Sequence, residues 1–380
     1  IRSNAMIMKA MLLSGAIAGL IALQDVLGID DRMKLDYIRN YGFTGIAIAL
    51  LGRNSGLGIV AAALLFSFLD RASSGSRPNV PEILIQRFGL ATIASAIRAF
   101  VPLYRATLGG VFNERSGIVN IGIDGMMIFG TWFGAWGALQ WGPVAGLLLA
   151  IAAGVAAAAL HAMATITFRV DQIVSGVAIL ILAVGIPRFL SIAAYGQGTQ
   201  SPQVPQLPKI DVPGLGDISP VVLLTVVLGA GSWFVLNRTV FGLRLRSAGE
   251  NPRAAESLGV RVKGMRWAGV LISGGFAGLA GGYLSIELVG LYREGMNQGR
   301  GFIALAALIL GNWSPIGAVF SCLLFAWTEA LTVFLQLDWI NNAFIASLPY
   351  IATLVVLALF SRRVRPPKAV GQAYEAGSPV

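Results

Sequence analysis

Long apolar runs separated by short polar segments make up most of this chain. An apolar run of about twenty residues can cross the roughly 30 Å hydrocarbon core of a bilayer as an α-helix. Runs close to this length occupy residues 6–27, 88–111, 117–139, 143–166, 172–194, 219–237, 266–288, 315–336 and 345–360. The pattern therefore predicts an all-α fold, a polytopic membrane helix bundle.

Three further apolar runs are short: residues 43–51, 57–69 and 302–312. A helix this short does not cross the bilayer upright. Broken or re-entrant backbone is tolerated at membrane depth only where other parts of the protein shield its polar groups. We therefore expect short broken or re-entrant helices that are packed inside the bundle.

Composition separates this chain from soluble proteins. Hydrophobic residues make up 56% and charged residues 12% of the chain, whereas soluble domains carry about a quarter charged residues. The net charge of +10 sits at the ends of apolar runs, as the positive-inside bias of membrane proteins requires, and not on a nucleic-acid-binding module. We expect a polytopic membrane protein, surrounded by lipid and without a nucleic-acid partner.

A basic loop, residues 238–266, separates two of the predicted spans. Its basic residues are Arg244, Arg246, Arg253, Arg261, Lys263 and Arg266. Lys and Arg accumulate in loops that stay in the cytoplasm, so this loop should lie inside the cell, as should the basic tail after Ser361. Within the loop, Pro252 suits the first position of a helix and Gly259 can end one. The sequence predicts a short capped helix over residues 252–258.

Several motifs of this chain are shared with one transporter family. Ala254-Ala255-Glu256 followed by Gly259 resembles the coupling-loop motif of ABC importer permeases. Segments 113–127, 170–176 and 311–317 look like those of the branched-chain amino acid, simple sugar and nucleoside permeases, most of all the nucleoside type. The resemblance covers about residues 92–365, and a second, partial likeness covers the first seventy or so.

The resemblance implies a transmembrane permease subunit of an ATP-driven importer with several partners. These are a cytoplasmic ABC ATPase dimer, a second permease subunit or copy, and an extracytoplasmic substrate-binding lipoprotein. The short helix would dock in a groove of the ATPase through Pro252, Ala254, Ala255, Glu256 and Gly259. The substrate would be a nucleoside or a simple sugar, and a branched-chain amino acid would be served by the same scaffold.

An internal repeat suggests that two permease copies are joined in this chain. Residues 1–70 align without a gap with residues 260–329. The identities include Ser14-Gly15 with Ser273-Gly274, Gly42-Phe43 with Gly301-Phe302, and Leu64-Leu65-Phe66 with Leu323-Leu324-Phe325. We interpret residues 1–75 as the C-terminal fragment of a first copy, 76–87 as a linker and 88–380 as a second, near-complete permease.

Four polar residues are candidates for the substrate pathway. Asp at the centre of a span costs about 2.5–3.5 kcal/mol on insertion scales unless it is paired or faces a cavity. Asn120 and Asp124 are four residues apart in the predicted span 117–139 and would share one helix face. The alternative is that Asp124 lies near the cytoplasmic end and is solvated. Asp171 and Gln172 open the next span but one, where Asp171 would equally serve as a helix cap.

Three glycines spaced by four, Gly274, Gly278 and Gly282, lie on one face of the predicted span 266–288. Small residues let membrane helices approach closely. This face is a candidate helix-packing surface, and an interface that shifts during transport is the alternative.

The chemistry that this sequence lacks narrows its function. It contains no Gly-x-x-x-x-Gly-Lys-[Ser/Thr] phosphate loop and no catalytic constellation, so we expect no enzyme activity and no cofactor. The single Cys322 and single His161 leave no clustered metal site and are expected to be packing residues. The rival interpretations are an ion-coupled secondary transporter, for which Asp124 is the best coupling carboxylate, and a nonfunctional fused remnant.

Overall fold

The computed structural model describes residues 84–212, 216–334, 351, 355 and 365–375. The predicted first copy at residues 1–75, most of the linker at 76–87 and nearly all of the run at 345–360 lie outside the described residues.

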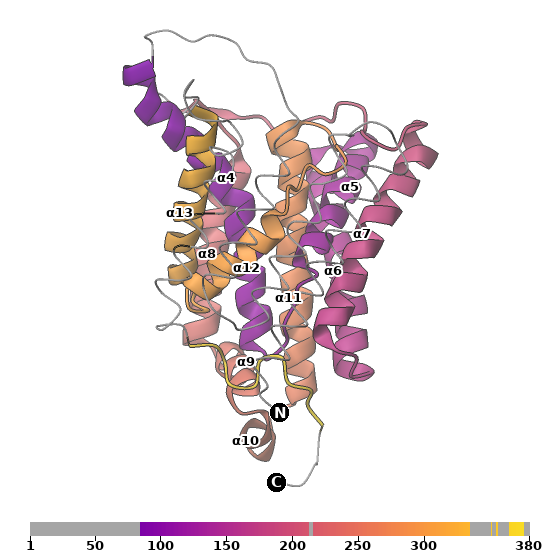
Figure 1. Ribbon diagram of the computed structural model, residues 1–380, viewed down its shortest axis with the longest axis vertical. Helices are drawn as coiled ribbons and strands as arrows, with labels where there is room; N and C mark the ends of the chain where they lie inside the picture. Colours follow the sequence, from indigo (N-terminus) through magenta and orange to yellow (C-terminus); the bar gives the residue numbers. More distant parts are fainter. Residues whose placement is uncertain (1–83, 213–215, 335–350, 352–354, 356–364, 376–380) are drawn as a thin grey trace, which may run out of the picture.

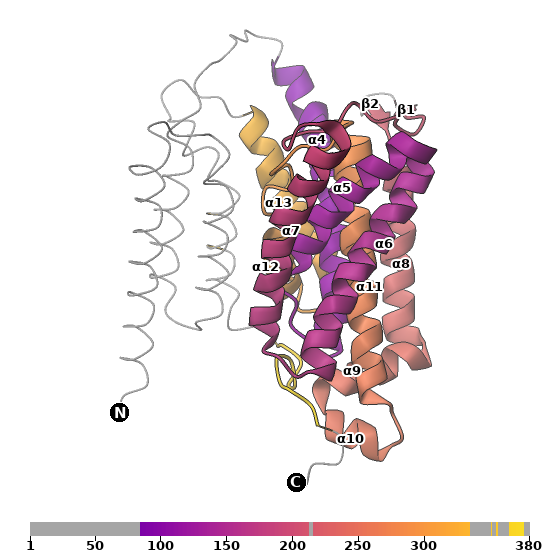
Figure 2. The same ribbon diagram turned by 90° about the vertical axis from the view of Figure 1, so that its right-hand side faces the viewer.

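Helices dominate the described residues (Figures 1 and 2). In chain order they are α4 (Leu84–Arg115), α5 (Ile123–Trp141), α6 (Pro143–Ala162), α7 (Gln172–Tyr195), α8 (Pro220–Arg238), α9 (Val240–Glu250), α10 (Pro252–Ser257), α11 (Val262–Gly282), α12 (Arg300–Leu310) and α13 (Pro315–Phe334). Two π-helical turns, η1 (Met163–Thr167) and η2 (Tyr283–Val289), continue α6 and α11. The predicted all-α bundle is confirmed, with one short antiparallel hairpin of β1 (Ile210–Val212) and β2 (Gly216–Ile218) between α7 and α8.

Four helices of the described part of the chain are long and apolar enough to cross a membrane, by length and composition. They are Pro143–Thr167, Gln172–Tyr195, Pro220–Arg238 and Val262–Val289. These bounds confirm the predicted spans at 143–166, 172–194, 219–237 and 266–288.

The α5 helix starts later than predicted. The sequence pattern placed a span over 117–139, but the helix begins at Ile123, after a non-helical stretch that we call the lead-in segment, residues 116–122. Figure 1 shows this segment as an open stretch of chain between the lower end of α4 and α5. Asn120 therefore lies outside the helix, and the expectation that it shares a helix face with Asp124 is wrong.

The α12 helix is short and enclosed, as the run at 302–312 predicts. It packs against α4, α13 and α5, and Gly301, Phe302, Ala304 and Ala307 are among its buried residues. Protein therefore surrounds this element, which is the condition under which a bilayer tolerates a broken helix.

The central helix of the bundle is α11, which packs on α6, α4 and α5. In its most apolar window 78% of the residues are buried, against 28–33% in the other three candidate spans. The three glycines spaced by four face α6. A Cβ on Gly278 would lie 2.2 Å from the carbonyl oxygen of Ala150, and one on Gly274 would lie 2.3 Å from the Cβ of Ala158. A Cβ on Gly282 would lie 2.7 Å from the Cβ of Ala150.

We expect Gly278→Ala to destabilise the bundle, because its methyl group meets α6 backbone that cannot yield without separating the helices. Overpacking of this kind costs about 1–3 kcal/mol. The measurement is the thermal unfolding midpoint of the purified protein in detergent.

Gly275→Ala is the matched control, because a Cβ there meets only side-chain atoms at 3.5 Å or more. Equal unfolding midpoints for the two variants would contradict the close α11–α6 contact.

Candidate functional site

The short α10 helix begins with a side-chain cap. The Asn251 carboxamide oxygen accepts a hydrogen bond from the backbone N–H of Ala254 at 3.1 Å. Pro252 follows as the first helical residue, where its missing N–H costs nothing and its fixed φ suits a helix. Such a cap contributes about 1 kcal/mol to a helix that is too short to be stable by itself.

The other end of α10 is closed by a glycine turn. Gly259 has φ +80°, a left-handed conformation that glycine adopts without a Cβ penalty. Its N–H donates to the carbonyl of Glu256 at 2.8 Å, and the N–H of Val260 donates to the carbonyl of Ala255 at 3.0 Å. The predicted short helix is confirmed, and it ends at Ser257.

The two faces of α10 differ sharply. Ala255 is buried in a small apolar cluster with Ala248, Val262 and Tyr374. On the outer side Leu258, directly after the helix, is 84% exposed, the most exposed of the large hydrophobic residues in the described part of the chain. An apolar side chain that is exposed in this way is available for contact with a partner protein. Sequence reasoning missed Leu258, which is one of three leucines in the basic loop at 238–266.

Charge identifies the side of the membrane on which α10 lies. The α10 helix forms the lower tip of the molecule, and the tail that follows the bundle runs close by it (Figures 1 and 2). Exposed cations surround it, namely Arg244, Arg253, Arg261, Lys263, Arg365 and Lys368. By the positive-inside bias we expect this end to be cytoplasmic.

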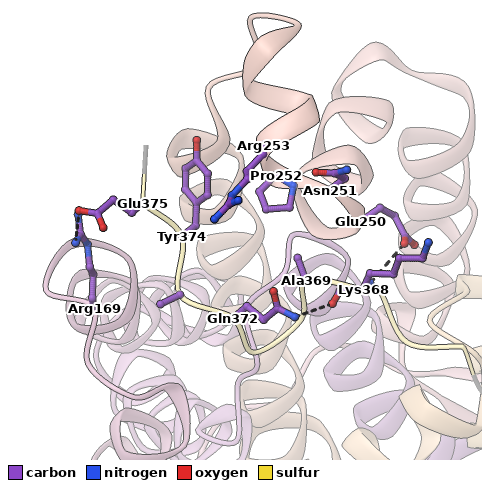
Figure 3. Close-up of a pocket in the computed structure, with 11 residues that line it drawn as sticks. Arg169, Glu250, Asn251, Pro252, Arg253, Lys368, Ala369, Gln372, Tyr374 and Glu375 are labelled. Atoms are coloured by element: carbon purple, nitrogen blue, oxygen red, sulfur yellow. Dashed lines mark hydrogen bonds and ion pairs between the residues drawn. The ribbon is translucent and has the colours of Figure 1, made fainter. Parts of the chain in front are cut away.

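A cleft of about 620 Å³ lies between the start of α10 and residues 365–375, which we call the cytoplasmic tail. Figure 3 shows Asn251 and Arg253 above Gln372 and Lys368, with Tyr374 pointing up beside Arg253. Burial, with a smaller contribution from the neighbouring Glu256, raises the pKa of the Tyr374 phenol to about 12. Tyr374 is therefore neutral at physiological pH.

A second cluster of polar groups lies inside the bundle, where α5 meets α12. Asp124 is 2% exposed. Its Oδ1 accepts a hydrogen bond from the backbone N–H of Gly301 at 2.8 Å and another from the Nδ2 of Asn297. The Asn297 Oδ1 is buried without a hydrogen-bond partner within the described residues. Asp124 is thus not solvated but ties the start of α12 to α5.

The lead-in segment is held by side chains of other elements. Gln172 Oε1 accepts from the N–H of Val119 at 2.6 Å, and Asn113 Nδ2 donates to the carbonyl of Ile118 at 2.8 Å. His161 Nε2 lies 3.1 Å from the carbonyl oxygen of Val119. Because a carbonyl only accepts, Nε2 carries the proton there and Nδ1 accepts from Ser175 at 2.9 Å. His161 is buried, as expected, and it also closes this network.

The three motifs behind the family resemblance meet around the lead-in segment. Gly176 of the 170–176 motif packs on it, since a Cβ there would lie 2.9 Å from the N of Gly122. From the 311–317 motif, Trp313 Nε1 donates to Glu114 Oε2 at 2.5 Å. Segments remote in sequence therefore form one structural unit between the membrane interior and the α10 end.

The other two candidate residues, Asp171 and Gln172, do not hydrogen-bond to Asp124, and each has a different role. Asp171 is exposed and caps α7, accepting from the N–H groups of Ile173 at 2.9 Å and Val174 at 3.0 Å. This is the capping role that the sequence left open for Asp171. Gln172 contacts the lead-in segment, and Asn120 donates to Met126 Sδ at 3.4 Å.

Metal chemistry has no support in the described part of the chain, which holds no group of three or more His, Cys, Asp or Glu side chains able to bind a metal ion.

An apolar bundle with a short helix enclosed in it and a capped helix exposed at its basic end defines the membrane-spanning subunit of a transporter.

Comparison with known proteins identifies the family. The model of the branched-chain amino acid transport system / permease component family matches residues 92–360. The chain belongs to this family of inner-membrane permease components, which are not enzymes.

Its relatives include permeases of nucleoside transporters. It is 40% identical over 318 residues to the guanosine ABC transporter permease protein NupQ of Bacillus subtilis (strain 168), covering 77% of this chain and 99% of that protein. It is 38% identical over 307 residues to the nucleoside ABC transporter permease protein NupC of Lactococcus lactis subsp. cremoris (strain MG1363), covering 74% and 96%. A second guanosine permease protein of the same B. subtilis strain, NupP, is 28% identical over 255 residues, covering 61% and 71%.

We expect Asp124→Ala to lower the thermal unfolding midpoint of the protein, because two buried donors, at Gly301 and Asn297, lose their acceptor. Each unsatisfied donor costs about 1–3 kcal/mol. Asp124→Asn keeps an acceptor oxygen of the same shape and should lose less. An unfolding midpoint of Asp124→Ala equal to that of the unaltered protein would refute the role of Asp124 as the tie between α5 and α12.

Proposed function

We propose that this chain imports a nucleoside by moving its substrate through the bundle when an ABC ATPase closes beneath α10. The observation that carries the proposal is α10 itself, a short helix capped at both ends and presented at the basic end of the bundle. The sequence similarity to guanosine and nucleoside permeases supports the substrate class.

In this proposal each coupling residue has a distinct part. Pro252 and Gly259 fix the two ends of α10, and Ala255 anchors it to the bundle. Ala254 is exposed and small, which lets a partner surface approach the helix closely. Glu256 and the exposed Leu258 would contact the ATPase, one through a charge and one through an apolar side chain.

We propose that the Asp124 cluster is part of the substrate pathway. Helix N-termini carry partial positive charge, and those of α5 and α12 meet at Asp124 deep in the bundle. Broken helices that meet inside a membrane are a common place for substrate sites in transporters. Asn297 Oδ1 and Asn120 Oδ1 have no hydrogen-bond partner in the part of the chain that the structure describes. These acceptors suit the hydroxyl and amino groups of a nucleoside. Gln172 acts by holding the lead-in segment that reaches this cluster, and Asp171 by capping α7.

The glycine face of α11 has a mechanical part in the proposal. Gly274 and Gly278 hold α11 at backbone contact with α6, and Gly282 packs on the Ala150 side chain. The two helices would therefore move as one rigid body when α10 is pushed. Rigid-body rocking of this kind is how transporters alternate access to a central site.

We propose three partners: an ABC ATPase dimer, a second permease subunit and an extracytoplasmic binding lipoprotein. The α7 and α8 helices leave large apolar side chains such as Phe189 (70% exposed) and Val226 (65% exposed) for lipid or another subunit. B. subtilis has two guanosine permease proteins that are both similar to this chain. These observations support a pair of related permease subunits.

We also propose that residues 1–75 are the C-terminal fragment of a first permease copy, that 76–87 are a linker and that 88–380 are the second copy. The repeat of residues 1–70 at 260–329 supports this division. The start of the family match at residue 92 is consistent with it.

The test uses proteoliposomes that contain the chain with the ABC ATPase encoded beside it, together with its binding protein. We expect ATP-dependent guanosine uptake, and we expect Leu258→Asp to abolish it. A charge placed in a docking groove should weaken the association by at least about tenfold, which pull-down of the ATPase from detergent measures directly.

Ser257→Ala is the matched control, because this neighbouring exposed side chain bonds only within its own helix, to the carbonyl of Ala254. Full ATPase binding and uptake by Leu258→Asp would contradict the docking assignment. Uptake that does not need ATP would contradict the transporter class.

A further inference from the structure

The cytoplasmic tail, residues 365–375, lies across the inner end of the bundle and bonds to several elements. In Figure 1 it is the yellow stretch of chain that crosses the lower end of α4 and α11. The N–H of Arg365 donates to Asn312 Oδ1 at 2.9 Å, beside the turn between α12 and α13. Arg169 and Glu375 form an ion pair at 2.8 Å near the start of α7. The pair is exposed and contributes little stability, but it shows how far the tail reaches.

The tail also contacts the inner face of α10 through Tyr374. This side chain is 8% exposed and packs in the cluster that contains Ala255, the buried residue of α10. The Arg266 guanidinium lies over the ring, 5.5 Å from its centroid. The Tyr374 hydroxyl lies close to the Glu256 side chain of α10. The packing contact with Ala255 is made by the ring.

Three residues before Tyr374, the tail bonds to the lead-in segment. The N–H of Gly371 donates to the carbonyl of Gly117 at 3.2 Å, and the N–H of Ala369 donates to the carbonyl of Gly249 at 2.9 Å. Gly249 and Gly117 themselves pack together, because a Cβ on Gly249 would lie 3.0 Å from the N of Gly117. The tail thus bridges α9 and the lead-in segment where they touch.

These contacts form a continuous path from the exposed helix to the interior of the bundle. A movement of α10 would displace Tyr374 through Ala255, and the tail would carry the displacement to Gly117. The lead-in segment then runs directly into α5 and Asp124. The exposed face of α10, with Leu258, takes no part in this path.

We propose that the cytoplasmic tail is a coupling strap, in which Tyr374 is a positioning residue that transmits the movement of α10 to the lead-in segment. This inference rests on the proposed function, because it assumes that an ATPase moves α10. The inference adds that binding of the ATPase and transmission of the α10 movement to the lead-in segment depend on different residues.

The experiment compares three quantities for each variant in the same proteoliposomes: ATPase retained on pull-down, ATP hydrolysed, and guanosine taken up. For Tyr374→Ala we expect normal ATPase retention and hydrolysis, with guanosine uptake per ATP reduced about fivefold or more. Tyr374→Phe should restore the coupling ratio, because the ring makes the contact. Ala373→Ser is the matched control in the same tail, since that side chain is exposed.

A second variant tests the other end of the strap and covers the case in which Tyr374→Ala does not fold. Gly371 has φ +79°, a conformation that a β-branched residue resists, so Gly371→Val should detach the tail from Gly117 while α10 stays intact. We expect the same loss of uptake per ATP.

The outcomes separate the strap from the proposed function. Uptake per ATP equal to that of the unaltered chain in both variants, or a loss in Tyr374→Ala that Tyr374→Phe does not restore, overturns the strap. A joint loss of ATPase retention and uptake also overturns it, because the tail would then be a docking surface only. If the unaltered chain binds no ATPase, the proposed function fails and the strap fails with it.

Discussion

The structure depends on one constraint: backbone that is not helical inside a bilayer must find all its hydrogen-bond partners within the protein. The lead-in segment breaks what would otherwise be a helix continuous with α5, and Gln172 and His161 of neighbouring helices satisfy its backbone groups. The short α12 helix also begins inside the bundle, and there Asp124 accepts a hydrogen bond from the N–H of Gly301. Polar residues of this apolar bundle thus stabilise the places where the chain leaves helical geometry.

The closely packed helices give these breaks a rigid frame. The glycine face of α11 brings α6 to backbone contact at Gly274 and Gly278, and α11 is the most enclosed of the candidate spans. A frame of this kind does not bend locally when one end is pushed, because packed interiors are close to incompressible. In the proposed mechanism, force applied at α10 passes to the α11–α6 unit and, by way of Tyr374 and the cytoplasmic tail, to the lead-in segment.

The sequence predicted most of the helices and α10, because those features are local. Apolar run length sets the spans, and Pro252 and Gly259 bracket α10 whatever surrounds it. The break before α5 was not predictable in this way, since residues 116–122 include apolar residues that suit a helix and are held open by Gln172, which lies far along the chain. For the same reason the pairing of Asn120 with Asp124 was wrong. The positions of Leu258 and Tyr374 follow from tertiary packing, which a pattern of apolar residues does not contain.

The most direct test of the account is to find out what touches α10 in the assembled transporter. A photo-cross-linking amino acid is placed at Leu258 and, in a separate sample, at Trp141, the last residue of α5, which is 65% exposed. Both samples are illuminated in membranes that contain the ABC ATPase. The account predicts a cross-link to the ATPase from position 258 and none from position 141. No cross-link from position 258, or equal cross-linking from both positions, would contradict it.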